Sequence, residues 1–215
     1  MIGIRMTSAS LGCTWLRLVN QILREGTPMG EEGLEVLGAR VAFAATTGPD
    51  PILDRFADPR MVSEMKKVFF SDTANSLGHS YAKLICGPDG RHDLQDIISL
   101  LSDQPQTKRA LVTFSNAPGG KVPCVNAVQF LVRNRAVQLM YFARGQDAFR
   151  KFYADALCLS TMAEAVAAAL HLEPGLVTGF IGSSHIYHSD MPAIQELLGS
   201  SKQLLATEPE EGALA

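Results

Sequence analysis

Residues 122–171 constrain the fold more than any other stretch, because two strand patterns are followed directly by a long apolar helix pattern. The segment PCVNAVQFLV and the segment AVQLMYFARGQDAF are separated by a short turn, and each has the composition of a β-strand. From Phe149 to His171, apolar residues recur at helical spacing and form a stripe wide enough for a buried helix. We therefore expect two strands and a central helix to organise the rest of the chain.

Chemically reactive side chains gather around the ends of these predicted elements. Cys124 lies at the start of the first strand, and Arg144 and Asp147 lie near the end of the second. Asp155 falls on the apolar stripe of the helix, where a carboxylate must be paired, hydrogen-bonded or protonated. Two simpler interpretations stay open. Cys124 could be a small apolar residue buried in the core, and Asp155 could be a carboxylate near the helix N-terminus that is stabilised by the helix dipole.

The other elements are predicted from periodicity and from glycine and proline breaks. Helices are expected at 15–25, 61–70, 93–101 and 192–198, and strands at 33–46, 110–114, 176–181 and 185–187. Residues 75–91 read as a loop and residues 182–184 as a turn. The apolar phase of 33–46 changes near Gly38, which a β-bulge would explain. We expect residues 1–198 to form a single domain and residues 199–215 an acidic, mobile tail.

Composition and charge narrow the class of protein. A chain of 215 residues can bury one sizeable core, and its net charge of −3 provides no basic field for a nucleic-acid polymer. The four cysteines form no CxxC pair and have no histidine at metal-ligand spacing, so we expect reduced thiols and no metal site. We find no run of about 18 apolar residues and no signal-peptide core, which predicts a cytoplasmic protein without a membrane partner.

Several segments occur in a characteristic order along the chain. They are GPDGRHDLQDIISLL, TKRALVTFSN, VPCVNAVQFLV and GSSHIYHSDM, together with the spacing from Cys124 through Arg144 to Asp147. In this order they resemble the thymidylate synthase and deoxycytidylate hydroxymethylase family, over about residues 15–191 and most strongly after Gly87. The resemblance implies a thymidylate synthase-like α+β fold, in which a bulged mixed β-sheet is packed by a long central helix and two chains form a sheet-to-sheet homodimer.

The resemblance also implies a covalent reaction at C5 of a pyrimidine nucleotide, by hydroxymethylation or methylation. Cys124 matches the nucleophile that adds to C6 of the base, and 5,10-methylenetetrahydrofolate is the one-carbon donor. Glu64 matches a glutamate that relays protons at the base, and Asp147 a carboxylate that faces the folate ring and the nucleophile. Tyr81 matches a tyrosine that assists removal of the proton from C5.

Further residues match the family's substrate-binding positions. Arg144 resembles the phosphate-binding arginine beside the thiol. Lys108 and Arg109 fall where the family has an arginine pair contributed by the other subunit, which implies a homodimer in which they reach the partner's site. His185 and Tyr187 match the pair that holds the sugar hydroxyl.

Asp155 occupies the position where thymidylate synthases carry an asparagine that reads uracil, and where cytosine-specific hydroxymethylases carry aspartate. Cytosine offers an amino donor and a ring-nitrogen acceptor. A carboxyl group that accepts from the first and, when protonated, donates to the second is complementary to this edge. We therefore expect a cytosine nucleotide as the substrate.

The chain departs from the family pattern at several places. The N-terminal phosphate loop is replaced by GTPMGEEG, the first residue of the arginine pair is Lys108, and Val125 follows the nucleophile in place of histidine. The tryptophans of the folate pocket and the C-terminal closing segment are missing. Two other functions stay open: a folate-independent enzyme that uses Cys124 as a nucleophile on a nucleotide or natural-product precursor, and a non-catalytic homologue that binds a nucleotide or a partner protein.

Overall fold

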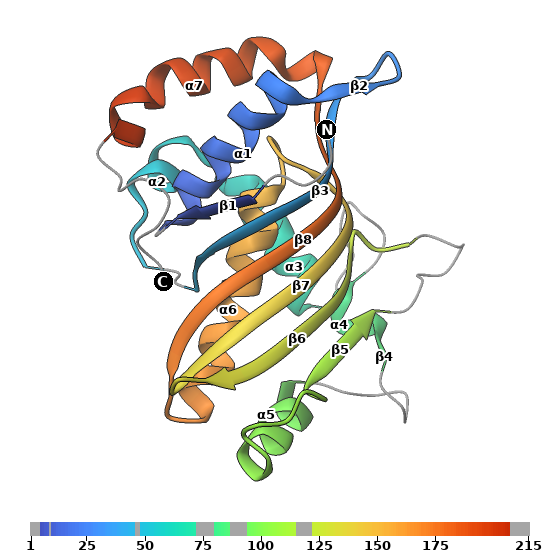
Figure 1. Cartoon of the computed structure of the whole chain (residues 1–215), viewed down its shortest axis with the longest axis vertical. Helices are drawn as coiled ribbons and strands as arrows, with labels where there is room; N and C mark the ends of the chain where they lie inside the picture. Colours follow the sequence, from blue (N-terminus) through green and yellow to red (C-terminus); the bar gives the residue numbers. More distant parts are fainter. Residues whose placement is uncertain are drawn as a thin grey trace.

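A computed structural model describes residues 5–8, 10–45, 48–71, 80–86, 94–114 and 122–206, and its central feature is one mixed β-sheet (Figure 1). The strand order is β1-β3-β8-β7-β6-β5-β4, and β2 pairs with β3 outside this path. Among the strands of the described residues, only β1 with β3 and β7 with β8 run parallel. The strands are β1 (Arg5–Ser8), β2 (Thr27–Met29), β3 (Gly33–Ala44), β4 (Ile85–Cys86), β5 (Leu111–Phe114), β6 (Val125–Arg133), β7 (Ala136–Asp147) and β8 (Glu173–Tyr187).

Helices in the described residues include three with clear start signals. Ser10 caps the first helix by accepting from the Cys13 N–H at 3.1 Å, and Asp50 and Asp58 cap the next two, each followed by a proline. The helices are α1 (Leu11–Glu25), α2 (Pro51–Phe56), α3 (Pro59–Phe70), α4 (Tyr81–Leu84), α5 (Leu94–Asp103), α6 (Phe152–Ala169) and α7 (Met191–Ala206), with a 3-10 turn, η2 (His188–Asp190).

Helix α6 is the buried central helix that the apolar stripe predicted. It contacts β7 and β8 as well as α1, α3 and α5, and in Figure 1 it runs behind the sheet. By length and composition α6 could cross a membrane, although we expected no such stretch, but 67% of it is buried inside the protein. We interpret it as a core helix, because its apolar surface is already covered by the sheet and the other helices.

The sheet changes its buried face partway along the strands. Consecutive buried residues of a strand are normally two apart, but they are three apart from Val36 to Ala39 in β3 and from Ile181 to Ser184 in β8. Strand β6 also shifts its register against β7 near its start. A three-residue step exchanges the two faces of a strand, because side chains alternate with a period of two. Gly38 sits at the step with a φ of 69°, which glycine tolerates without strain. The phase change expected near Gly38 is therefore present, although β3 and β8 keep one register throughout.

Two predicted interruptions are wrong. The expected turn at 182–184 does not exist, because β8 continues through it and pairs with β3 on one side and β7 on the other. Backbone pairing on both edges overrides the local turn preference of the Gly-Ser-Ser sequence. The predicted loop at 75–91 contains α4 and β4, while residues 72–79 and 87–93 lie outside the described residues.

The final helix is longer than expected. It was predicted to end at 198, but α7 continues to Ala206, so the expected boundary between domain and tail falls inside a helix. Ile194 and Leu197 are buried, and Ser201 beyond the predicted end is also buried. Residues 207–215 lie outside the described residues, and the division into one domain and a mobile tail stays a prediction.

The face of the sheet turned away from α6 is apolar. In Figure 1 this is the near face of β6, β7 and β8, and the described helices leave it uncovered. The rings of Phe142 and Phe180 stack on it with centroids 5.8 Å apart, and their exposed fractions are 40% and 47%. Other exposed large apolar residues of the sheet are Met140 on β7, Leu37 on β3 and Leu111 on β5. Such a patch is typical of a surface that another protein covers.

Candidate active site

Cys124 lies at the mouth of β6, where two neighbouring elements hold its backbone. The Arg144 N–H of β7 donates to the Cys124 carbonyl at 2.9 Å, and the next N–H, of Val125, donates to the Tyr81 hydroxyl at 3.0 Å. The Tyr81 ring is clamped by Phe69 and Phe114, at centroid distances of 4.4 and 4.7 Å. The Cys124 side chain remains partly exposed. It is therefore a thiol that a ligand can reach.

Tyr81 lies next to this thiol in a buried, acidic environment. Burial and then the charge of Asp155 raise the pKa of Tyr81 well above its ordinary value, and the Cys124 charge acts in the same direction. The hydroxyl consequently keeps its proton at neutral pH. It can donate a hydrogen bond or pass a proton through water, but it is a poor phenolate base.

Arg144 places a cation against the two residues that precede Cys124. Its Nη2 donates to the Val122 carbonyl at 2.8 Å, and its Nε donates to the Pro123 carbonyl at 3.2 Å. The backbone N–H of Arg144 also lies 3.0 Å from the Asn126 Oδ1 that accepts from it. The guanidinium group is thus fixed at the segment before Cys124 while its residue stays exposed, which suits an anionic group of a ligand.

Asp155 is 2% exposed and is fully engaged. Its Oδ2 accepts from Gln146 Nε2 at 2.8 Å, and Lys151 Nζ lies 3.2 and 3.0 Å from Oδ1 and Oδ2. Burial lowers the pKa of Lys151, but the negative charges of Asp155, Cys124 and Asp147 raise it by more, so the net shift is upward. Lys151 therefore lies close to all three of these acidic groups, and sequence reasoning missed it.

Asp147 ends β7 and begins the connection to α6. Its Oδ1 accepts from the Phe149 N–H at 3.1 Å and from the Arg150 N–H at 2.8 Å. Burial raises the pKa of Asp147, against the opposing effects of the Arg150 hydrogen bond and of His185, its neighbour on β8. The carboxyl group thus fixes the turn and also borders the site.

We expect Asp147→Asn to become progressively more stable relative to the wild type as pH rises from about 4 to about 7. A carboxyl group whose pKa is raised in the folded state binds its proton more tightly there than in the unfolded chain. Its contribution to stability is therefore lost as pH rises from the ordinary value of 3.8 through the raised pKa. Asparagine keeps an acceptor for both N–H groups and does not titrate. Thermal unfolding followed by circular dichroism measures the difference, with the exposed Asp103→Asn as control; a difference in Tm that is constant with pH contradicts this prediction.

His185 and Tyr187 extend the site along β8. Their rings meet edge to face with centroids 5.2 Å apart. Within the described part of the chain, the buried Nδ1 of His185 has no hydrogen-bond partner. Burial, Asp147 and Glu32 raise the pKa of Tyr187, so its hydroxyl stays a donor. A ligand hydroxyl would satisfy the imidazole nitrogen.

Three other predicted residues make contacts elsewhere in the protein. Glu64 on α3 pairs with Lys67 at 3.6 Å and lines a surface pocket with residues that have no predicted role. Lys108 and Arg109 are exposed just before β5, where Gln129 Nε2 donates to the Lys108 carbonyl at 2.8 Å. The structure thus gathers Cys124 with Tyr81, Arg144, Asp147, Asp155, His185 and Tyr187, and leaves the roles of the other three as predictions.

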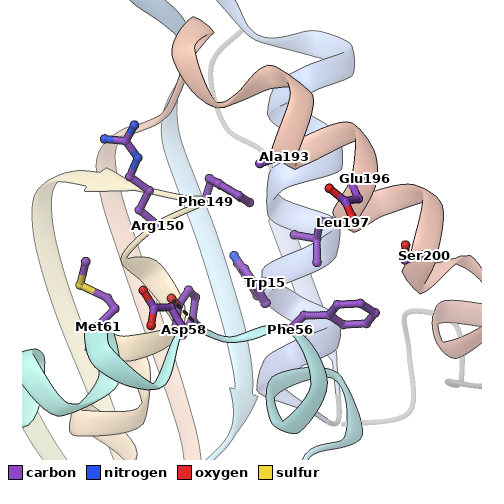
Figure 2. Close-up of a pocket in the computed structure, with 11 residues that line it drawn as sticks. Trp15, Phe56, Asp58, Met61, Phe149, Arg150, Ala193, Glu196, Leu197 and Ser200 are labelled. Carbon is purple, nitrogen blue, oxygen red and sulfur yellow. Dashed lines mark hydrogen bonds between the residues drawn. The ribbon is translucent and has the colours of Figure 1, made fainter.

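A pocket of about 490 Å³ borders the β7–α6 connection (Figure 2). Figure 2 shows Trp15 of α1 in its interior, with Phe149 and Arg150 on one side and Leu197 of α7 on another. Trp15 Nε1 donates to the Ala148 carbonyl at 2.9 Å, which ties α1 to the connection. The full lining is Trp15, Phe56, Asp58, Met61, Phe149, Arg150, Tyr153, Ala193, Glu196, Leu197 and Ser200. No sequence pattern indicated this pocket, because its walls come from four separate stretches of the chain.

One side of this pocket is polar. The Tyr153 hydroxyl accepts from the Asp58 N–H at 3.1 Å, and burial raises the pKa of Tyr153 to about 12, so the hydroxyl keeps a proton to donate. Arg150 is bound to Asp190 at 2.6 Å. The pocket therefore combines aromatic walls with several fixed polar groups, as small-molecule sites do.

Comparison with known proteins identifies relatives along most of the chain. The family model described as thymidylate synthase matches residues 54–208. A protein of Methanococcoides burtonii named "Putative thymidylate synthase" is 24% identical over 207 residues, which cover 92% of this chain and 95% of the relative. Proteins of the same name match from Methanosarcina mazei, 22% identical with the same coverage, and from Methanocaldococcus jannaschii, 32% identical over 42% of this chain and 45% of the relative.

Proposed function

This chain belongs to the thymidylate synthase family, and from that premise we propose that it transfers a one-carbon unit to C5 of a pyrimidine nucleotide through an adduct of Cys124 at C6. The single observation that supports this most is the position of Cys124. The partly exposed Cys124 directly follows the Val122–Pro123 segment that the Arg144 guanidinium binds, and it lies within electrostatic reach of Lys151. The thiolate is the nucleophilic form of a cysteine.

The proposed reaction begins when the Cys124 sulfur forms a bond to C6 and the C5–C6 electron pair moves to C5. C5 then bonds to the one-carbon unit. Loss of the C5 proton and departure of the unit's carrier, with the electron pair of the carrier–carbon bond, give an exocyclic methylene while the sulfur stays on C6. The neutral Tyr81 hydroxyl can relay the C5 proton to water. Addition of water to the methylene gives hydroxymethyl, and addition of hydride from the reduced carrier gives methyl. In either case the thiolate then leaves C6 and the C5–C6 double bond re-forms. We favour hydroxymethyl.

The pocket beside the β7–α6 connection suits a flat heterocyclic cofactor. Aromatic side chains wall it, and the carboxylates of Asp58 and Glu196 could accept hydrogen bonds from ring amino groups. Methylenetetrahydrofolate would supply the one-carbon unit when bound. The same carboxylates would repel the acidic tail of a folate, which favours a folate-independent reaction of Cys124 as the second candidate.

A homodimer is the proposed assembly. The N–H of Phe130 donates to the Ala110 carbonyl at 2.8 Å, so Arg109 lies beside the middle of β6. Cys124 precedes Phe130 by six residues, a separation of roughly 20 Å at 3.3 Å per residue. Lys108 and Arg109 are therefore too far from their own thiol to share a phosphate with Arg144. If two chains paired through the apolar face of the sheet, these cations could reach the site of the partner subunit.

Cytosine is the proposed base, and it leads to a binding prediction. We expect CMP or dCMP to bind at least about tenfold more tightly than dUMP, because uracil meets Asp155 with its donor and acceptor exchanged. Asp155→Asn should narrow or invert this preference. Isothermal titration calorimetry with the three nucleotides measures it, and equal affinity for all three in both proteins would remove the basis for cytosine.

The test of the whole proposal is release of tritium from C5-labelled nucleotide, with and without methylenetetrahydrofolate. Release that requires the cofactor supports the one-carbon transfer. Tritium release that is equally fast without methylenetetrahydrofolate supports the folate-independent alternative. The absence of release and of nucleotide binding would overturn both.

A further inference from the structure

Lys151 is a partly buried cation in the site that the proposed reaction does not yet use. Its side chain is 14% exposed, whereas that of its partner Asp155 is 3% exposed. The ammonium group is therefore the more accessible member of the pair. Lys151 starts the α6 segment, and it lies within electrostatic reach of Cys124 and Asp147.

The hydrogen bonds of the pair engage Asp155 as an acceptor. The carboxylate accepts from Lys151 through both oxygens and from Gln146 through Oδ2. A carboxylate between an ammonium and an amide donor is an acceptor only. It can receive the amino group of cytosine, but the ring nitrogen N3 requires a donor from elsewhere.

We propose that Lys151 is a specificity residue: it occupies Asp155 as a hydrogen-bond acceptor and donates to N3 of cytosine, so that the lysine and the aspartate together recognise the base. The ammonium group has three N–H bonds, and contacts with two carboxylate oxygens leave one for a ligand. The inference rests on the proposed function and replaces the protonated aspartate that the sequence suggested.

The two modes of reading differ in their response to pH. Lys151 faces Asp155 on α6, Cys124 before β6 and Asp147 at the end of β7, while Tyr81 of α4 lies near Asp155 and Cys124. These acidic groups keep the ammonium charged across neutral pH. Recognition of cytosine by Lys151 and Asp155 together is therefore independent of pH in this range. Recognition by a protonated Asp155 would instead weaken as pH rises and the carboxyl group loses its donor.

The experiment is calorimetric titration with dCMP and dUMP at several pH values from about 6 to about 8.5. The ratio of the two affinities cancels the titration of the phosphate that both ligands carry. We expect a constant ratio for the wild type. In Lys151→Met, dCMP should bind about tenfold more weakly at neutral pH, and its affinity relative to dUMP should fall as pH rises, because only a protonated Asp155 could then donate.

In Lys151→Arg, the ratio of dCMP affinity to dUMP affinity should again be independent of pH. The matched control is Lys202→Met on the surface of α7. The inference would be overturned if the ratio of dCMP affinity to dUMP affinity fell as pH rose in the wild type, or if Lys151→Met left that ratio unchanged. If Lys151→Met does not fold, the wild-type profile and the arginine variant still decide. A wild type that binds neither nucleotide would instead count against the proposed function itself.

Discussion

Replacing Cys124 with serine should lower tritium release from C5-labelled nucleotide by at least about 10⁴-fold and leave the fold intact. A serine hydroxyl does not ionise near neutral pH, so it cannot add to C6, and C5 then never becomes nucleophilic. The substitution keeps the shape of a partly exposed side chain, so we expect the free energy of unfolding to change by less than about 1 kcal/mol. Release assays and chemical denaturation measure the two effects on the same preparation.

The matched control for this variant is Cys13→Ala, which removes a buried thiol on α1. It should cost some stability through a small cavity and leave the rate of release per folded molecule unchanged. If Cys124→Ser releases tritium as fast as the wild type, Cys124 is not the nucleophile. Unchanged nucleotide binding with no release in any protein would favour the non-catalytic alternative.

The strands and helices that carry the site were predictable where periodicity was strong. The helix predicted at 149–171 is α6, and the two strands before it are β6 and β7. The prediction of a turn at 182–184 was wrong because a short run of small polar residues is compatible both with a turn and with a strand that is paired on both edges. Only the partners of β8, which are distant in sequence, decide between the two.

The candidate site was predictable at strand ends and less so elsewhere. Cys124, Arg144 and Asp147 come together because β6 and β7 are adjacent in both sequence and space. Lys151 could have been found from its i,i+4 spacing to Asp155 on one helix face. The pocket lined by Trp15 and Glu196 could not, because it depends on how α1 and α7 pack. The comparisons establish the family and leave the role of each residue to experiment.

Replacing both Phe142 and Phe180 with aspartate should convert the proposed homodimer to monomers. Their stacked rings lie on the exposed apolar face, and four carboxylates brought together across a two-fold axis would repel and lose their hydration. Light scattering coupled to size-exclusion chromatography measures the mass. The matched control is Phe70→Asp, which alters an equally exposed ring on α3. A wild type that is already monomeric, or a double variant that stays dimeric, would exclude this face as the interface.

Loss of the dimer should also lower turnover, if Lys108 and Arg109 act in the partner's site. Mixing subunits tests this without disturbing the interface. A Cys124→Ser chain still supplies both cations, and a chain with Lys108→Ala and Arg109→Ala still supplies the thiol. A heterodimer of the two therefore has one complete site and one site that lacks both parts. Random exchange of equal amounts should restore about a quarter of wild-type turnover. Turnover no higher than the sum of the separate variants would place these cations outside the reaction.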